Sequence, residues 1–185
     1  VYATLILRLF LRARHEDAAR RSLVSLLLAF LPAVVIGILA HDFVKSVLFE
    51  TPMLIAIVLI LGGFVLLVID RIAPAPVHHD ALALPFRKSL AIGVCQTLAL
   101  VPGVSRSGAT IVGALLMGVE KRAAAEFSFL LSLPTMGAAV AYDLYKNRDV
   151  LDFAAMWDIA IGFGVAFLTA AIVVRWVLTF ISKHG

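Results

Sequence analysis

The stretch Pro102-Gly-Val-Ser-Arg-Ser-Gly-Ala-Thr110 interrupts the strongly apolar part of the chain that runs through residues 90–101 and 109–119. An arginine at membrane depth costs about 2.5–3.5 kcal/mol on insertion scales, so it requires a partner, a water-filled cavity or a function. The glycines let the backbone turn closely, and the hydroxyls and the guanidinium supply hydrogen-bond donors. We therefore expect this stretch to bind an anion, and a phosphate fits its chemistry best.

The composition is typical of a helical membrane protein. Of the 185 residues, 62% are hydrophobic and 15% are charged, and the mean hydropathy is +1.04. Several apolar runs reach the roughly 20 residues that cross about 30 Å of hydrocarbon. The basic residues lie at the ends of these runs, so the net charge of +4 indicates membrane topology and not nucleic-acid binding. The single cysteine, Cys95, excludes an internal disulfide.

The apolar pattern predicts an all-α, polytopic membrane protein. Full spans are expected over residues 22–40, 52–69, 123–142 and 159–180. Residues 1–11 have the pattern of the tail of an earlier span, and residues 41–51 that of a short connection. Because the chain starts inside an apolar stretch and without Met, we expect it to be a fragment of a single membrane domain.

Residues 89–119 are predicted to form a re-entrant helical hairpin. As a helix, residues 89–101 would be about 20 Å long, which is too short to cross a bilayer. Irregular backbone at membrane depth is tolerated where it lines a cavity or is buried in protein. A single broken span is the alternative, and the basic residues decide between the two.

The hairpin gives the more uneven distribution of charge. Apart from Arg106, it places every basic residue except Lys45, Lys146 and Arg148 on one side of the membrane. A broken span would divide the basic residues more evenly. The positive-inside rule therefore favours a hairpin that enters from the cytoplasm with its tip near the bilayer midplane.

The motif contains the signals for a helix end followed by a helix start. Pro102 and Gly103 are expected to stop the first half-helix, and Ser105 or Ser107 to cap the second. The free N–H groups and the positive dipole end at a helix N-terminus attract phosphate oxygens. Arg106 adds a planar fork suited to bidentate contact with phosphate.

Other interpretations of these residues stay open. The serines can be ordinary helix caps, with Arg106 paired to a buried acid or to carbonyl groups. Gln96, inside the first half-helix, can face the same cavity or act as a packing amide. We find no nucleophilic triad, clear general base or convincing set of metal ligands in the sequence, so a complete hydrolytic site is not encoded here.

Two longer strings carry a resemblance to a known family. Gln96-Thr-Leu-Ala-Leu-Val-Pro-Gly-Val-Ser-Arg-Ser-Gly-Ala-Thr110 and Glu126-Phe-Ser-Phe-Leu-Leu-Ser-Leu-Pro134 resemble the bacterial undecaprenyl-diphosphatases associated with bacitracin resistance. The resemblance implies an inner-membrane hydrolase that converts undecaprenyl diphosphate into the monophosphate carrier reused in peptidoglycan synthesis. It also implies two inverted repeats, each with a re-entrant hairpin, and a site open to the periplasm.

The same resemblance assigns roles to the motif residues. Arg106, with Ser105, is expected to take part in catalysis by clamping the diphosphate. The full diphosphate-binding set implied is Gln96, Ser105, Arg106, Ser107, Gly108 and Thr110.

The family's first signature, a Glu-x-x-x-Glu helix followed by Pro-Val-Ser-Ser-x-Gly-His, has no counterpart here. We expect it before Val1, and a final span after Gly185. It would supply the nucleophile and the acidic ligands of Mg²⁺ or Ca²⁺, so we expect no metal ligands in these residues and an inactive isolated fragment.

The expected partners are the lipid substrate and the membrane lipids. The sequence does not fix the oligomeric state, and a homodimer is compatible with it. The alternative function is a transporter or flippase for an anionic prenyl phosphate lipid, because midplane half-helices and repeated halves also occur in transporters.

Overall fold

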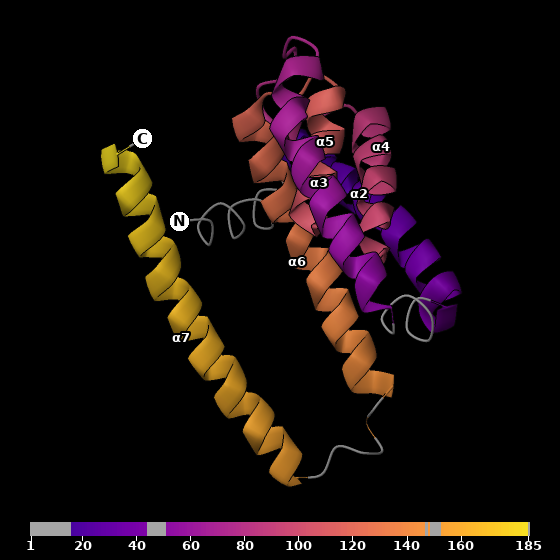
Figure 1. The fold of residues 1–185 in the computed structure, drawn as a ribbon, viewed down its shortest axis with the longest axis vertical. Helices are drawn as coiled ribbons and strands as arrows, with labels where there is room; N and C mark the ends of the chain where they lie inside the picture. The colour runs from indigo at the N-terminus through magenta and orange to yellow at the C-terminus, as the bar shows by residue number, and fades with distance from the viewer. Residues whose placement is uncertain (1–15, 44–50, 147, 149–152, 185) are drawn as a thin grey trace. The chain divides into compact units, whose positions relative to one another are not determined.

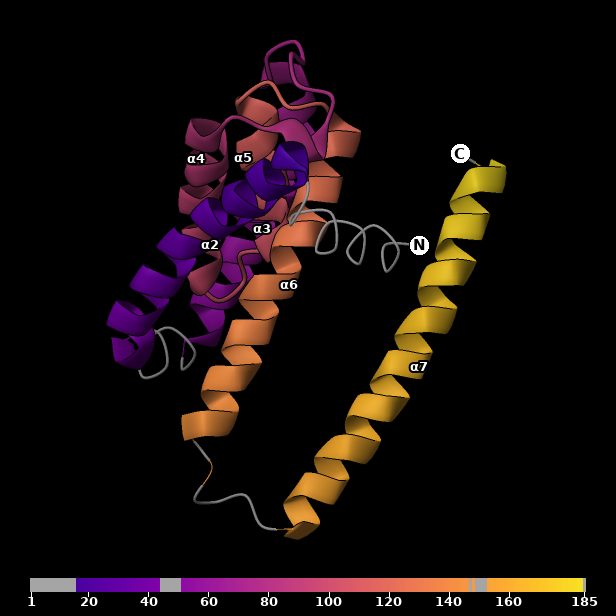
Figure 2. The same ribbon diagram turned by 180° about the vertical axis from the view of Figure 1, so that it is seen from behind.

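The computed structural model describes residues 16–43, 51–146, 148 and 153–184. Figures 1 and 2 show the helices of this part of the chain from two sides. Apart from one isolated β-bridge, all of its regular secondary structure is helical: α2 (Asp17–Phe43), α3 (Pro52–Ile72), η2 (Ala81–Ala83), α4 (Phe86–Thr97), η3 (Leu98–Leu100), α5 (Arg106–Leu116), α6 (Lys121–Lys146) and α7 (Phe153–His184). The predicted all-α class is confirmed. The expected span tail at 1–11 and most of the connection at 41–51 lie outside the described residues.

Four of these helices contain a stretch long and apolar enough to cross a membrane: Asp17–Ala40, Pro52–Ile72, Lys121–Lys146 and Met156–Val173. Each overlaps one of the expected spans, and the helices themselves continue past the expected ends into polar residues. The prediction of a polytopic membrane protein is confirmed. The chain is a multi-pass membrane protein.

The chain forms two compact units, with the division inside α6 after Ala138. The second unit contains the end of α6 and all of α7. Along α7, the rings of Phe163 and Phe167 stack with their centroids 6.4 Å apart. The buried core and every candidate site residue belong to the first unit.

Helices α4 and α5 form the helical hairpin expected over residues 89–119. They lie side by side (Figures 1 and 2), and the start of α4 meets the end of α5, where Lys88 Nζ donates to the Met117 carbonyl oxygen. At this same end, the carboxylate of Asp70 on α3 pairs with Lys121 on α6 at 2.8 Å. The chain therefore enters and leaves the hairpin at the end of the unit where α3 stops and α6 starts.

A backbone clasp joins the loops at this end. Gly118 ends α5 with a positive φ of 74°, and its carbonyl oxygen accepts hydrogen bonds from the amides of Val77 (2.8 Å) and His78 (3.1 Å). The His78 carbonyl in turn accepts from the Glu120 amide at 2.8 Å. The loop after α3 thus fixes the turn between α5 and α6.

The loop between the two hairpin helices extends beyond the N-terminus of α5. An 11-residue α5 is about 16 Å long, against about 31 Å for the 21 residues of α3. A Cβ at Gly103 would lie 2.7 Å from the carbonyl oxygen of Ile55, in the first turn of α3. The N-terminus of α5 therefore lies about level with the middle of α3. The loop before α5 continues past it and reaches nearly to the N-terminus of α3. The position of the hairpin tip near the bilayer midplane stays a prediction.

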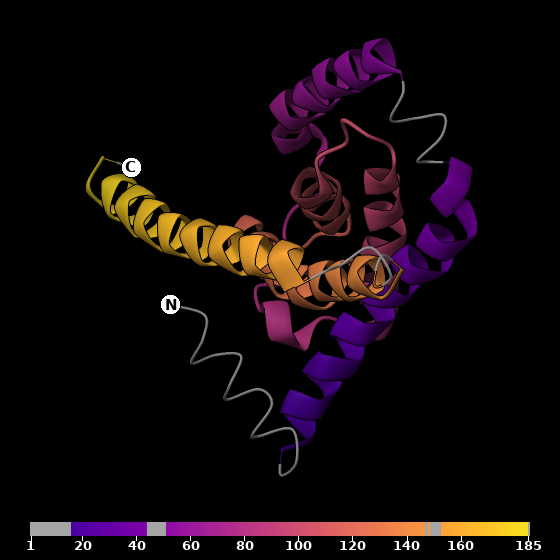
Figure 3. The ribbon, with the colours of Figure 1, turned by 90° about the horizontal axis from the view of Figure 1, so that it is seen from below.

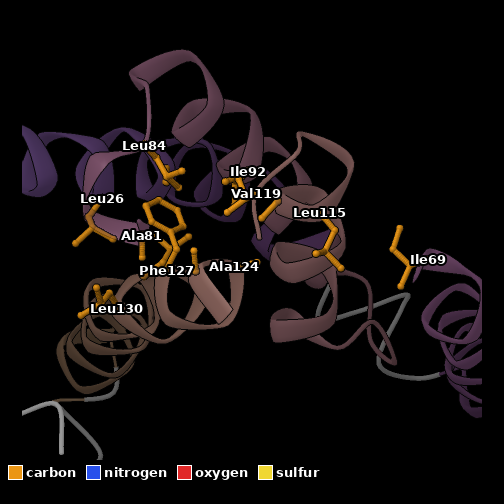
Figure 4. Packing of buried hydrophobic residues seen from close by; sticks show 14 residues of the cluster. Leu26, Ile69, Ala81, Leu84, Ile92, Leu115, Val119, Ala124, Phe127 and Leu130 are labelled. Carbon is orange, nitrogen blue, oxygen red and sulfur yellow. The ribbon is translucent and has the colours of Figure 1, made fainter. Parts of the chain in front are cut away.

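The core of the first unit lies where α2 and α6 pack against the hairpin of α4 and α5. Viewed from below, α4 and α5 lie between α2 and α3 (Figure 3). The ring of Phe127 is almost fully buried and lies beside Ala81 and Leu84 (Figure 4). Ser22 and Ser25 of α2 attach the same loop by donating to the carbonyls of Leu82 (2.6 Å) and Leu84 (3.3 Å), respectively.

Helices α2 and α4 approach so closely that their contact requires a glycine. A Cβ added at Gly93 would lie only 2.2 Å from the carbonyl oxygen of Ala29, which is a backbone atom and cannot rotate away. Small residues allow this kind of backbone approach between membrane helices. Gly62 on α3 is the opposite case, because a Cβ there would meet nothing within 4 Å.

We predict that Gly93→Ala destabilises the full-length protein by about 1–3 kcal/mol, the usual effect of overpacking. The matched control is Gly62→Ala, which adds the same methyl group to an open helix face and improves helix propensity by up to about 1 kcal/mol. Thermal denaturation in detergent, followed by circular dichroism, measures both. Equal melting temperatures for the two variants would contradict the close approach of α2 and α4.

Candidate functional site

The site starts at the N-terminus of α5. Gly103 turns the chain with φ of +95°, and Ser105 then caps the helix by accepting a hydrogen bond from the Gly108 amide at 3.1 Å. Of the two serines considered as caps, the structure uses Ser105. By helix geometry, the amides of the first two helical residues, Arg106 and Ser107, have no intrahelical acceptor and can face an anion.

Arg106 is held by a neutral side chain from the facing helix. Its Nη2 donates to Oε1 of Gln96 at 3.0 Å, and Gln96 is only 2% exposed. The amide nitrogen of Gln96 then donates to Oγ1 of Thr135 on α6 at 3.3 Å. Gln96 therefore acts as a packing amide that also contacts the site arginine. Its contact with a bound diphosphate stays a prediction.

The other hydrogen-bond donors of Arg106 indicate which kind of ligand it can bind. Its Nε is buried and has no hydrogen-bond partner in the part of the chain that the structure describes. In that part, no carboxylate forms an ion pair with Arg106 either. Because Gln96 is neutral, it holds the half-buried guanidinium without offsetting its positive charge, so Arg106 is well suited to a charge-assisted bond with an anion.

Thr110 lies one turn further along α5 and faces α6. Its side chain is 1% exposed, and its Oγ1 is 2.6 Å from the Oγ of Ser128, which is 4% exposed. The same Oγ1 also lies 3.1 Å from the carbonyl oxygens of Arg106 and Ser107. We expected Thr110 to contact the diphosphate, whereas the structure places its hydroxyl in the contact between two helices.

The expected site residues thus divide into two layers. Ser105 and Ser107 are exposed, and Arg106 and Gly108 are half-buried beside them. A side chain at Gly108 would crowd Ser105, since a Cβ there would lie 3.1 Å from the Ser105 Cβ. Gln96 and Thr110 form the buried layer behind them.

The donor set does not fit a divalent cation. The layers contain hydroxyls, an amide and a guanidinium, whereas Mg²⁺ and Ca²⁺ prefer carboxylate and carbonyl oxygens. Among the described residues, no group of three or more His, Cys, Asp or Glu side chains could hold a metal ion. These residues therefore contain no binding site suited to Mg²⁺ or Ca²⁺.

Two contacts on α6 were not predicted from the sequence. Ser128 and Thr135 hold Thr110 and Gln96, respectively, and neither was singled out as a site residue. A signal was present, because hydroxyls at 128, 132 and 135 recur at helical spacing in an otherwise apolar run. Such a row places the hydroxyls on one face of α6, which turns toward the hairpin.

Comparisons with known proteins agree over the length of the chain. A family model described as "Bacitracin resistance protein BacA" matches residues 2–185. A relative named "Undecaprenyl-diphosphatase" from Cereibacter sphaeroides is 60% identical over all 185 residues, which cover 69% of that protein. Relatives from Paracoccus denitrificans (59% identical) and Mesorhizobium japonicum (53%), named "Undecaprenyl-diphosphatase" and "Undecaprenyl-diphosphatase 1", align over the same shares of both chains.

We predict that Thr110→Val destabilises the full-length protein, because it removes the hydroxyl shared with Ser128 while keeping the side-chain shape. Interhelical hydrogen bonds in membrane proteins contribute on average about 0.6 kcal/mol and at most about 1.7 kcal/mol. Denaturation of Thr110→Val, Ser128→Ala and the double variant in detergent measures the coupling. Fully additive effects of the two substitutions would show that the hydroxyls do not interact.

Proposed function

This chain belongs to the family of the bacitracin resistance protein BacA, and we propose that it hydrolyses undecaprenyl diphosphate to undecaprenyl phosphate and inorganic phosphate. The observation that carries the proposal is the position of Arg106 at the helix N-terminus of α5, with a buried Nε that has no partner among the described residues. A terminal phosphate supplies the oxygen acceptors that such an arrangement requires. The product would return to peptidoglycan synthesis, and this recycling would confer bacitracin resistance.

The outer layer of the site would bind the diphosphate. Arg106 presents a planar fork to two phosphate oxygens, and the amides of Arg106 and Ser107 point along the α5 axis toward the same charge. The exposed hydroxyls of Ser105 and Ser107 can add further hydrogen bonds. Gly108 keeps the approach open, since it has no side chain to block the phosphate.

The same groups would act on the transition state. In hydrolysis a nucleophile attacks the terminal phosphorus, the bond to the bridging oxygen breaks, and negative charge collects on the equatorial and leaving oxygens. Arg106 and the N-terminus of α5 are fixed before the reaction, so they stabilise this charge without reorganisation. We propose that the nucleophile comes from the family's first signature, and that Mg²⁺ or Ca²⁺ assists from ligands outside the two layers.

The charges support an orientation in the inner membrane. The basic residues at the helix ends where the hairpin enters and leaves support a cytoplasmic location for that end: Arg71, Arg87, Lys88, Lys121 and Arg122. The loop before α5 extends toward the opposite end, so the site would open to the periplasm. The prenyl chain would lie against apolar, exposed helix surface such as that of α3.

A homodimer is a further proposal, which crosslinking in native membranes would test.

We predict that Arg106→Ala in the full-length enzyme lowers phosphate release from undecaprenyl diphosphate by about 10²–10³-fold, as removal of one preorganised donor does in other enzymes. The matched control is Arg87→Ala at the cytoplasmic end of the same hairpin, where Arg87 is exposed; it should keep near-normal turnover. Phosphate release in detergent measures both. Near-normal turnover by a folded Arg106→Ala variant would rule out the clamp.

The same phosphate-release assay distinguishes a hydrolase from a transporter. Detergent removes the two compartments and any gradient, so an enzyme releases inorganic phosphate there whereas a transporter or flippase releases none. Absence of phosphate release by the unmodified protein, with transfer of the labelled lipid between leaflets in vesicles, would replace the hydrolase proposal.

A further inference from the structure

The row of hydroxyls on α6 includes one whose hydrogen bonds lead directly to the site arginine. Thr135 Oγ1 accepts from Gln96 Nε2 at 3.3 Å, and Gln96 Oε1 accepts from Arg106 Nη2 at 3.0 Å. These three residues come from α6, α4 and α5. The chain of bonds therefore links the guanidinium to a helix that contributes nothing to the outer layer of the site.

We propose that Thr135 is a positioning residue that fixes Arg106 through Gln96; this inference rests on the proposed phosphatase function. Thr135 does not reach the outer layer, where the phosphate would bind. Its effect is to determine which end of the Gln96 amide faces the guanidinium.

The direction of the hydrogen bonds explains how it does so. Thr135 donates its hydroxyl hydrogen to the Leu131 carbonyl oxygen at 2.7 Å, so only its lone pairs remain for Gln96. The NH₂ end of the amide must then face Thr135, and the oxygen end must face Arg106. If the Gln96 amide were rotated by 180°, its NH₂ group would face the guanidinium of Arg106. Two donors would then point at each other, and the buried NH₂ group would have no acceptor.

The consequence for Arg106 is a fixed side-chain position. An arginine has several rotatable bonds, and holding it in one conformation costs side-chain entropy. The buried Gln96 carries that restraint before the substrate arrives, because its own orientation is fixed from the backbone of α6. Preorganised donors of this kind contribute most to the stabilisation of developing charge.

The test uses Thr135→Val, which keeps the shape and removes the hydroxyl, and Thr135→Ser, which keeps the hydroxyl. In the full-length enzyme we expect Thr135→Val to lower kcat for phosphate release about tenfold, and Thr135→Ser to retain activity within about twofold, since tenfold corresponds to about 1.4 kcal/mol of transition-state stabilisation. Equal activity of Thr135→Val and the unmodified enzyme would overturn the proposal.

A second variant separates positioning from general support of the fold. In a Gln96→Leu background the chain of bonds is already broken, so Thr135→Val should cause no further loss of kcat. If it again lowers kcat tenfold, Thr135 does not act through Gln96 and the proposal fails. Ser132→Ala is the matched control, because the Ser132 hydroxyl donates to its own helix at the Phe129 carbonyl (2.6 Å); its effect should be the same in both backgrounds.

The outcomes also separate this inference from the proposed function. An unmodified enzyme without phosphatase activity would refute the function itself. An active enzyme that is insensitive to Thr135→Val would refute only the positioning role. If Thr135→Val fails to fold, Thr135→Ala replaces it: it also removes the hydroxyl, so it should lower kcat about tenfold with Gln96 present and cause no further loss in the Gln96→Leu background. Equal effects in the two backgrounds would refute the positioning role.

Discussion

The hydrogen bond between Arg106 and Gln96 is the interaction on which the site depends. A guanidinium inside a membrane protein must have partners, and a carboxylate partner would neutralise the charge that a phosphate requires. A neutral amide holds the arginine and leaves that charge available. This requirement explains why α4 and α5 lie side by side in opposite directions. Arg106 is the first residue of α5, and Gln96 lies in the last turn of α4.

The hairpin can hold these two residues in register because it is fixed at both ends. At the end where α4 starts and α5 stops, the clasp at Gly118 and the pair Asp70–Lys121 join it to its neighbours. Along its length, Gly93 lets α4 lie directly against α2. At the far end, Gly103 packs on the first turn of α3. Glycine is required at each of the last two contacts because the facing atom is backbone.

The fold class, the hairpin and the Arg106 motif could be predicted because each depends on a local pattern: apolar length, the distribution of basic residues, and a helix stop followed by a cap. The second layer could not. Whether Thr110 meets a ligand or Ser128 depends on how closely α5 approaches α6, and the orientation of Gln96 depends on a hydroxyl 39 residues away. The reach of the loop past the middle of α3 likewise results from tertiary packing of Gly103.

The hydrogen bond from Lys88 to the Met117 carbonyl makes the electrostatic potential at the two ends of α5 unequal in size. A cation at a helix C-terminus offsets the negative end of the macrodipole, by typically 0.3–1 kcal/mol at an exposed site. At the positive end, the first turn of α5 contains no acidic residue, so no carboxylate there offsets the dipole in the same way. Seen from its N-terminus, α5 therefore behaves less like a dipole than like a single positive charge, whose attraction for a phosphate weakens more slowly with distance.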